Sequence, residues 1–471
     1  MAAELTFWSM MFIVFYSYAG YGILAIMAAR IPFLLKLVPK PYNSRPGGRY
    51  TAELPRISLI ISVSGETSGT MLDKIINTEK LNYPKDKLEV IYAAAFEKPD
   101  DSAVSSYYNC YIEDLNNGAN EYDEQLYCEF LKFEGSSRIS SVYILDEIER
   151  KLNNSGIDSG KLTPGCKQKL DRFYLKISEN ERIEVKLTKD IIRKGKISQV
   201  NRTIKNATGE IVVFSDVNTE FNRDSLMNLA SHFCDPSVGC VAGEKRISAG
   251  KNSTSDEGEG LYWKYESRIK EADSAIYSTV GAAGEIFAIR KELWEKVYTP
   301  GAIIEDFVIS MKIAALGYTV KYEKNAYAIE EPTGKINDEY IRRRRIAAGG
   351  FQAIVMLKSL LNIFKYRILS FQYISHRVLR WAVVPFILPL LLVLNIYLAS
   401  GGSYLYTALL FLQVSYYLLS AGGYIMELKK KKIKLLYFPY FITMMNTAAY
   451  SGLVRYISGK QSVVWEKVKR A

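Results

Sequence analysis

Long apolar runs lie near both ends of the chain, and a polar, alternating middle separates them. Residues 5–29 are almost unbroken apolar sequence, enough for a helix across the roughly 30 Å hydrocarbon layer of a membrane, which takes about 20 residues. Runs of the same kind follow at 379–399, 404–426 and 435–457. The pattern predicts about four transmembrane helices, one within residues 1–40 and the others within a C-terminal region at 378–471.

The middle of the chain alternates short apolar runs with helical patterns, which predicts an α/β domain over residues 55–335. RISLIISVS has the length and β-branched content of a buried strand, GTMLDKIINTEKL has helical spacing, and LEVIYAAAF is a second strand candidate. Between about 100 and 189 the pattern loosens into polar sequence, which we interpret as an insertion on one face of the domain. Strand and helix patterns then alternate again up to Glu330.

Residues 336–377, which link this domain to the second apolar run, are rich in both basic and bulky apolar residues. Amphipathic basic helices of this kind lie along a membrane surface, where they can press a neighbouring domain against the bilayer. RVLRW at 377–381 is interpreted as an anchor at the membrane interface. For the Arg run at 342–345, a plain lipid-facing basic patch is the alternative to a binding role.

The distribution of charge predicts the side of the membrane on which the middle domain lies. The lead-in MAAE has no positive charge and basic residues follow the first apolar run, so a cleavable signal peptide is not expected. By the positive-inside rule, the middle domain would lie in the cytoplasm, on an integral protein of the plasma or cytoplasmic membrane. Much of the net charge of +11 is concentrated beside the apolar runs, which favours anionic lipid over nucleic acid as a partner.

Residue chemistry argues against two further classes of protein. Five scattered cysteines without a CxxC pair, and only two histidines, make a zinc site improbable. The long α/β domain argues against a pure transporter. So does the lack of a charged residue well inside any predicted span, because ion pathways usually need one.

Four islands of sequence hold polar or charged residues at strand ends and helix starts. They are SDVN with Asp216 and Asn218, IIEDF with Glu305 and Asp306, RRRRI with Arg342, Arg345 and Ile346, and a pair of segments with Ser64, Glu66, Lys196 and Asn201. Taken singly each island is weak, because Asp and Asn favour strand-end turns and acidic residues favour first helical turns. Ligands of open α/β sheets nevertheless bind at the carboxyl ends of strands, where SDVN lies.

In their order and spacing, the islands resemble the inverting nucleotide-sugar transferases of glycosyltransferase family 2, the group of cellulose, chitin and hyaluronan synthases. The resemblance covers about residues 55–381, apart from the insertion. It implies a GT-A-type, Rossmann-like domain with a mixed sheet, joined to interface helices and a membrane region.

The resemblance implies chemical roles for the two acidic islands. Asp216 and Asn218 stand where the family has DxD, and would hold Mg²⁺ or Mn²⁺ against the donor diphosphate. Glu305 and Asp306 match the family's TED motif, in which the Asp is the general base that takes the proton of the acceptor hydroxyl. Both islands would therefore lie at one catalytic site.

The Arg run stands where the family has QxxRW. Arg342 and Arg345 would bind the leaving diphosphate, since a guanidinium matches phosphate oxygens. Ile346 replaces the Trp on which polymerising relatives stack the acceptor sugar, which weakens any case for processivity.

On the nucleotide side, Ser64, Glu66, Lys196 and Asn201 would bind the nucleotide and its diphosphate. The family Asp that reads uracil at the end of the second strand is missing, because Ala94, Ala95 and Phe96 stand there, and Glu97, Asp100 or Asp101 are candidates to replace it. On the acceptor side, Gly281 and Gly284 in VGAAGEIFAIR permit close approach of a ligand to backbone, with a tight turn as the alternative.

We therefore expect a membrane-bound enzyme of polysaccharide or glycan synthesis that moves a sugar from a UDP-sugar to a hydroxyl of a growing glycan or lipid-linked acceptor. Ile346 favours a single-sugar transferase over a polymerase, and four spans are few for a channel, although a homo-oligomer could build one. The alternative from another class is a catalytically silent membrane scaffold, favoured by DxN, the missing strand-end Asp and the insertion.

Overall fold

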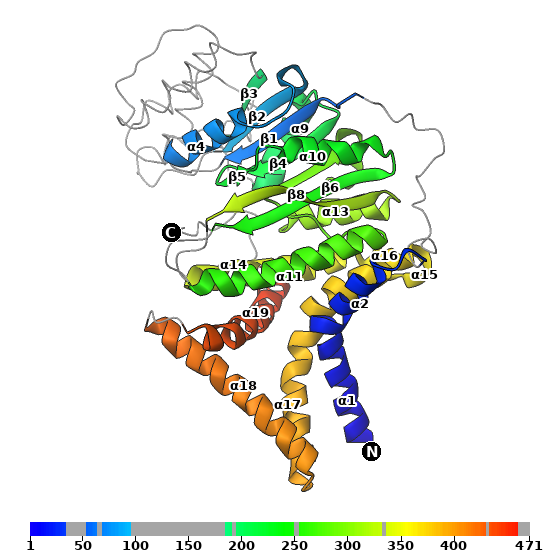
Figure 1. Ribbon diagram of the computed structural model, residues 1–471, viewed down its shortest axis with the longest axis vertical. Helices are drawn as coiled ribbons and strands as arrows, with labels where there is room; N and C mark the ends of the chain where they lie inside the picture. The colour runs from blue at the N-terminus through cyan, green and yellow to red at the C-terminus, as the bar shows by residue number, and fades with distance from the viewer. Residues whose placement is uncertain are drawn as a thin grey trace.

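The computed structural model describes residues 1–33, 53–63, 68–95, 184–190, 195–248, 254–331, 336–429 and 433–459. Ser64, Glu66, Phe96, Glu97, Asp100, Asp101 and most of the predicted insertion lie outside these ranges. Figure 1 shows an α/β domain at one end of the molecule and long helices, including the N-terminal one, at the other.

A mixed sheet forms the centre of the α/β domain, with eight strands in the described part of the chain and the order β3-β2-β1-β4-β7-β6-β8-β5. The strands are β1 Ile57–Val63, β2 Leu88–Ala95, β3 Glu184–Asp190, β4 Ile211–Asp216, β5 Thr219–Phe221, β6 Val238–Ile247, β7 Ile286–Arg290 and β8 Thr319–Glu330. β1 runs parallel to β2 and β4, whereas β7 runs antiparallel to β4 and β6. The expected mixed α/β sheet is confirmed.

Helices cover both faces of this sheet, which explains why β1 and β4 are near-continuous apolar runs with almost every residue buried. The helices of the domain are α4 Ser68–Glu79, α9 Lys196–Asn206, α10 Ser225–Ser231, α11 Thr254–Ile276, α12 Trp294–Val297 and α13 Glu305–Ala315, with short 3₁₀ turns at Lys85–Lys87, His232–Cys234 and Lys291–Leu293. In the core, the rings of Phe214 on β4 and Phe287 on β7 stack at 4.4 Å between centroids. This packing fixes the central strands, from whose ends the site residues extend.

Interface and long helices follow the α/β domain. They are α14 Ile336–Met356, the 3₁₀ turn Lys358–Leu361, α15 Ile363–Tyr366, α16 Ile368–Tyr373, the π-helix η7 Ile374–Val383, α17 Val384–Ser400, α18 Tyr404–Leu428 and α19 Lys434–Ile457. Three helical segments precede the domain: α1 Ala2–Phe15, the π-helix η1 Tyr16–Gly20 and α2 Tyr21–Ala28. In Figure 1, α11 and α14 lie between the sheet and the long helices.

Among the described residues, three helical segments are long and apolar enough to cross a membrane: Ala2–Ala28, Ile368–Ser400 and Tyr404–Leu428. The fourth predicted span, 435–457, is the helix α19 but is not one of them. It packs along α14, and a Cβ on Gly452 would lie 2.6 Å from the Cβ of Ala347. Polar residues such as Asn446 and Arg455 lower its hydropathy, so the approximate count of four becomes three.

The end of the predicted insertion belongs to the sheet. β3 pairs in parallel with β2 at the sheet edge, with Glu184 opposite Glu89 and Asp190 opposite Ala95. Its alternating sequence, EVKLTKD, is typical of an edge strand with one exposed face. The sequence boundary near residue 189 therefore falls at the end of a strand of the domain itself.

Candidate active site

Lys196 joins three of the predicted islands at the carboxyl edge of the sheet. It is the first residue of α9, and Gly195 before it has φ 93°, a left-handed conformation that glycine adopts without strain. The Lys196 ammonium donates to Oδ1 of Asp216 at 2.6 Å and lies 3.4 Å from Oε1 of Glu305. It also donates to the carbonyl oxygen of Gly284 at 3.3 Å. Segments nearly 110 residues apart thus meet at one ammonium group.

Asp306 faces the same space. Glu305 and Asp306 form the first turn of α13, where the helix dipole favours negative charge. A Cβ placed on Gly284 would lie 3.3 Å from Oδ2 of Asp306 and 3.5 Å from Nζ of Lys196. The carboxylates of Asp306 and Asp216 therefore lie at one site, with Lys196 between the two acidic islands.

The pKa values of Asp306 and Lys196 shift in ways that give the two groups different roles: Asp306 can accept a proton, and Lys196 stays positively charged. Burial, together with the nearby carboxylates of Glu305 and Glu285, raises the pKa of Asp306 to about 7, although Lys196 acts in the opposite direction. Burial lowers the pKa of Lys196, but the charges of Asp216 and Glu305 outweigh it, and the net pKa lies above the ordinary lysine value. Asp306 can accordingly exchange a proton near neutral pH beside a permanent positive charge.

The acidic turn is held in place by α14. The amide N–H of Ile303 donates to Oε1 of Gln352 at 2.9 Å, and Nε2 of Gln352 donates to the carbonyl of Gly301 at 2.9 Å. A Cβ on Gly349 would lie 2.9 Å from the side chain of Ile304, so the helix approaches this loop closely. α14, predicted as an amphipathic interface helix with diphosphate-binding arginines, therefore also positions Glu305 and Asp306.

A second group of charges lies beside the SDVN loop. The Lys245 ammonium contacts the carboxylates of both Glu285 and Glu330, and Nη2 of Arg342 lies 3.5 Å from each of them. Nδ2 of Asn218 is 3.5 Å from Oε1 of Glu330. Two cations and two carboxylates balance here, and Arg342 is thereby placed next to the strand-end loop.

The donor set of SDVN fits a divalent metal that the substrate helps to bind. Among the described residues, no group of three or more His, Cys, Asp or Glu side chains could hold an ion by itself. Asp216 supplies one carboxylate, with about 30% of its side chain exposed, and Asn218 can supply an amide carbonyl. Mg²⁺ and similar ions are commonly bound by one or two carboxylates together with substrate phosphates. The residues therefore fit a metal shared with a diphosphate.

Two other predicted residues have clear packing roles. Oδ1 of Asn201 accepts the indole N–H of Trp294 at 2.9 Å, which ties α9 to α12. Gly281 has φ 88°, and a Cβ there would lie 2.2 Å from the Phe307 ring. Only glycine fits this position, directly behind the helical turn that carries Asp306.

Within the Arg run, Arg342 makes the contacts with Glu285 and Glu330, whereas Arg345 lies one turn further along α14 with 8% of its surface exposed. Ile346, next to it, is half-buried.

The RVLRW segment, predicted as an anchor at the membrane interface, has partners in the α/β domain. It lies in the π-helix η7 and packs against the α/β domain, with Arg377 at 2.5 Å and Arg380 at 3.0 Å from the buried Glu266 carboxylate of α11. The Trp381 ring lies 5.0 Å from the Phe307 ring. Its arginines supply the cationic partners that the buried carboxylate of Glu266 requires. Through Trp381 the segment also contacts the first helical turn of α13, and so connects this turn with the long helices.

Lys74 was missed by sequence reasoning. On α4 it is 2% exposed, and its ammonium donates to Oγ of Ser215 at 2.7 Å and to the carbonyl of Thr219 at 2.6 Å. Burial lowers its pKa to about 7, against the influence of Asp216. It clamps the loop that carries Asp216, yet a lone lysine in a helical pattern gives no signal in the sequence.

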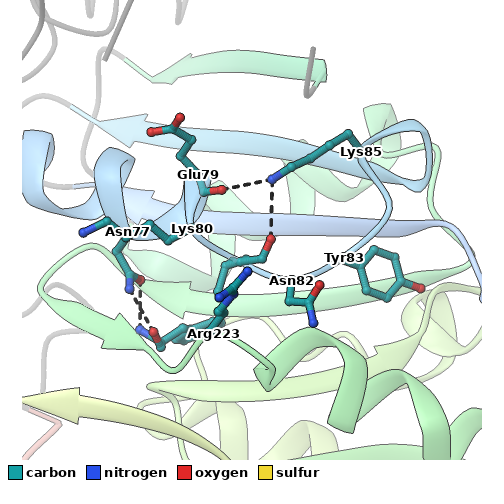
Figure 2. A pocket seen from close by; sticks show the side chains of 9 residues that line it. Asn77, Glu79, Lys80, Asn82, Tyr83, Lys85 and Arg223 are labelled. Atoms are coloured by element: carbon teal, nitrogen blue, oxygen red, sulfur yellow. Dashed lines mark hydrogen bonds between the residues drawn. The ribbon is translucent and has the colours of Figure 1, made fainter. Parts of the chain in front are cut away.

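A pocket of about 520 Å³ lies between the end of α4 and Arg223, away from these clusters (Figure 2). Its polar groups mostly satisfy one another. Lys85 donates to the carbonyl of Glu79 at 3.0 Å, and Asn77 exchanges two hydrogen bonds with the backbone of Phe221. No residue of the four islands lines it. We therefore assign it no role in the chemistry.

Part of the chain is similar to known glycosyltransferases. Residues 211–420 match the model described as "Glycosyl transferase family group 2". A poly-β-1,6-N-acetyl-D-glucosamine synthase of Staphylococcus epidermidis is 27% identical over 185 residues, or 38% of this chain and 44% of that protein. The Staphylococcus aureus (strain COL) protein of the same name is 25% identical over 213 residues, 43% and 47% respectively. The chain thus spans less than half the length of these curated relatives.

Among solved structures, a mannosyltransferase of Pyrobaculum calidifontis, PcManGT, in complex with GDP-Man and Mn²⁺, matches over 97% of this chain and 99% of its own, with a TM-score of 0.58 and 19% identity. At this identity the likeness concerns the fold. The fold is therefore of the GT-A type. The match to the family model runs from β4 into α18 and marks this part of the chain as similar to the glycosyl transferases of that group.

Proposed function

We propose that this protein is an inverting glycosyltransferase that moves a sugar from a nucleotide-sugar, most simply a UDP-sugar, to a hydroxyl of a glycan or lipid-linked acceptor at a membrane. One observation carries the proposal: Asp306, whose pKa is about 7, shares a site with the Lys196–Asp216 pair. The family match supports the reaction class. The names of the relatives, poly-β-1,6-N-acetyl-D-glucosamine synthases, support a nucleotide-sugar donor.

In the proposed reaction, Oδ2 of Asp306 accepts the proton of the acceptor hydroxyl as that oxygen attacks the anomeric carbon. The bond between that carbon and the diphosphate oxygen breaks on the opposite face, so the configuration inverts. Lys196, Arg342 and Arg345 hold the diphosphate through charge-assisted hydrogen bonds. Glu305 keeps the Asp306 pKa raised and pairs with Lys196.

Asp216 and Asn218 would hold Mg²⁺ or Mn²⁺, whose chemistry is to neutralise the charge that develops on the leaving diphosphate. In the structure Lys196 occupies Oδ1 of Asp216. When the donor enters, its phosphates offer this ammonium a second anionic partner. The Mn²⁺ in the mannosyltransferase complex supports the same metal class.

The three apolar helices support residence in a membrane, with the α/β domain on the cytoplasmic side where nucleotide-sugars are made. We take residues 55–335 as the catalytic domain and 336–377 as the interface region. Ile346 in place of an aromatic platform favours transfer of single sugars. Product length on a gel would distinguish this from polymerisation.

The test is release of UDP by the purified full-length protein with Mn²⁺ and a panel of UDP-sugars. We expect release with at least one donor, and its loss in Asp306→Asn. Asp86→Asn, at an exposed position of the same domain, is the matched control and should behave as wild type. Donor binding without turnover by the wild-type protein would instead support a silent scaffold.

A further inference from the structure

α11 carries a buried lysine beside the site that the proposed reaction does not use. Lys270 is 6% exposed and lies one helical turn from both Glu266 and Asp273, on the same face of the helix. Within the described ranges, its ammonium makes no hydrogen bond or ion pair. A lysine side chain this buried usually has an anionic partner, so an ammonium without a hydrogen bond or ion pair points to a ligand that supplies one.

The carboxylates nearest to Lys270 along α11 are already engaged. The partners of Glu266 are Arg377 at 2.5 Å, Arg380 at 3.0 Å and Nε2 of His376 at 3.1 Å, and those of Asp273 are Nδ1 of His376 at 2.7 Å and the Tyr21 hydroxyl at 2.5 Å. Glu266 and Asp273 therefore already have their own partners, and Lys270 pairs with neither.

Arg377, which pairs with Glu266, has a second hydrogen-bond donor without a partner among the described residues. Nη2 of Arg377 donates to the carbonyl of Val280 at 3.5 Å, but its buried Nε finds no partner among the described residues. Val280 precedes Gly281, which packs on the ring of Phe307, the residue next to Asp306. An ammonium and a guanidinium N–H thus remain available close to the proposed base.

The charges that act on Lys270 fit this location. Its pKa is lowered, first by burial and then by Arg377, while the carboxylates of Glu266, Asp306 and Glu285 act in the opposite direction. Its ammonium therefore lies within electrostatic range of both the Glu266–Arg377 ion pair and the proposed base.

We propose that Lys270 and Arg377 form an anion subsite that binds a phosphate group of the acceptor next to Asp306. This rests on the proposed function. A phosphate can take hydrogen bonds from an ammonium and from a guanidinium at once. The donor diphosphate has its own partners at Lys196 and Asp216, so this site suits the acceptor. Arg377 belongs to the segment Ile368–Ser400, which is long and apolar enough to cross a membrane, so a phosphate carried by a lipid is the expected occupant.

Equilibrium binding tests the subsite without any turnover. The full-length protein in phosphatidylcholine nanodiscs is titrated with tritiated geranylgeranyl phosphate, and binding is competed with geranylgeraniol or with inorganic phosphate. For Lys270→Met we expect the Kd to rise about tenfold or more, the loss of one charge-assisted contact. Lys270→Arg should bind nearly as wild type. Lys264→Met, at an exposed position on the same helix, should not change binding.

The subsite is supported if the neutral alcohol competes about tenfold more weakly than the prenyl phosphate. Competition by inorganic phosphate that disappears in Lys270→Met also supports it, and assigns the phosphate to a soluble acceptor. Equal competition by alcohol and phosphate on the wild-type protein, or an unchanged Kd in a folded Lys270→Met protein, overturns it. UDP release is measured separately, so failure of the subsite and failure of the proposed function remain distinguishable.

Discussion

Two buried charge clusters lie close together in this molecule, and they are balanced differently. In the cluster around Lys196, which we propose to be catalytic, Asp216, Glu305 and Asp306 share one ammonium and the Asp306 pKa rises to about 7. In the interface network, two arginines and a histidine surround Glu266.

Burial alone would raise the Glu266 pKa, but Arg377, His376 and Arg380 outweigh it and hold the pKa well below its ordinary value. The comparison shows how pairing decides the use of a buried carboxylate. Glu266, a carboxylate with several cationic neighbours, stays ionised and holds segments together. Asp306, a carboxylate that shares one cation with other carboxylates, can take up a proton in the neutral pH range.

The largest expected effect is at the base. Asp306→Asn should lower kcat for sugar transfer by about 10²–10⁴-fold, the usual contribution of a general base, with little change in donor affinity. Because the raised pKa means that the ionised carboxylate is disfavoured in the folded state, the variant should melt at the same or a higher temperature at pH 8. Steady-state kinetics and thermal melting check both. If Asp306→Asn instead melts at a lower temperature with normal kcat, then Asp306 stabilises the fold and is not the base.

The interface network should show the opposite behaviour. Glu266→Gln leaves Arg377 and Arg380 without their buried partner and should cost about 3–5 kcal/mol of folding free energy. Denaturant unfolding measures this. Because the folded-state pKa of Glu266 is depressed, its contribution is present above the ordinary Glu pKa and is lost as pH falls through the depressed value. A Glu266→Gln protein as stable as wild type at pH 7 would show that the network is not a brace.

Lys196→Met should lie between these extremes. It removes the cation shared by Asp216 and Glu305, and we expect kcat/KM for the donor to fall about 100-fold, near the cost of a buried charge-assisted contact. Loss of the ammonium should also raise the Asp306 pKa further, since Lys196 lowers it. The acidic limb of the rate profile would then move to higher pH. Lys205→Met, on the exposed face of α9, is the matched control.

The smallest expected effect concerns the contact between α14 and the loop before α13. Gln352→Leu removes two hydrogen bonds to Ile303 and Gly301 and should cost about 1–3 kcal/mol. Because Asp306 would be held less firmly, kcat should fall several-fold while donor KM stays unchanged. A change in KM alone would mean that α14 acts on the donor rather than on the acidic turn.

The proximity of the residues around Lys196 could be predicted from sequence because they stand at fixed places in regular elements. Asp216 ends a strand, Asp306 opens a helix, and Lys196 begins the helix before that strand. The mixed sheet followed from the same alternation. What the pattern left out was β3, because its polar alternation resembles loop sequence until its pairing with β2 is known.

The interface network could not be predicted, because its members gain meaning only from partners far away in sequence. His376 and Glu266 are 110 residues apart, and Tyr21 and Asp273 are 252 apart. Arg377 and Trp381 were interpreted as a membrane anchor from composition alone. Whether a basic residue meets lipid or a buried carboxylate depends on tertiary contacts that no local pattern contains.

The most direct measurement is the pH dependence of kcat for sugar transfer between pH 5 and 9. With Asp306 as the base, activity should be lost as pH falls, with an apparent pKa of about 7, because protonation removes the group that accepts the acceptor proton. A limb near pH 4, the ordinary range of a carboxyl group, or a flat profile would contradict the account.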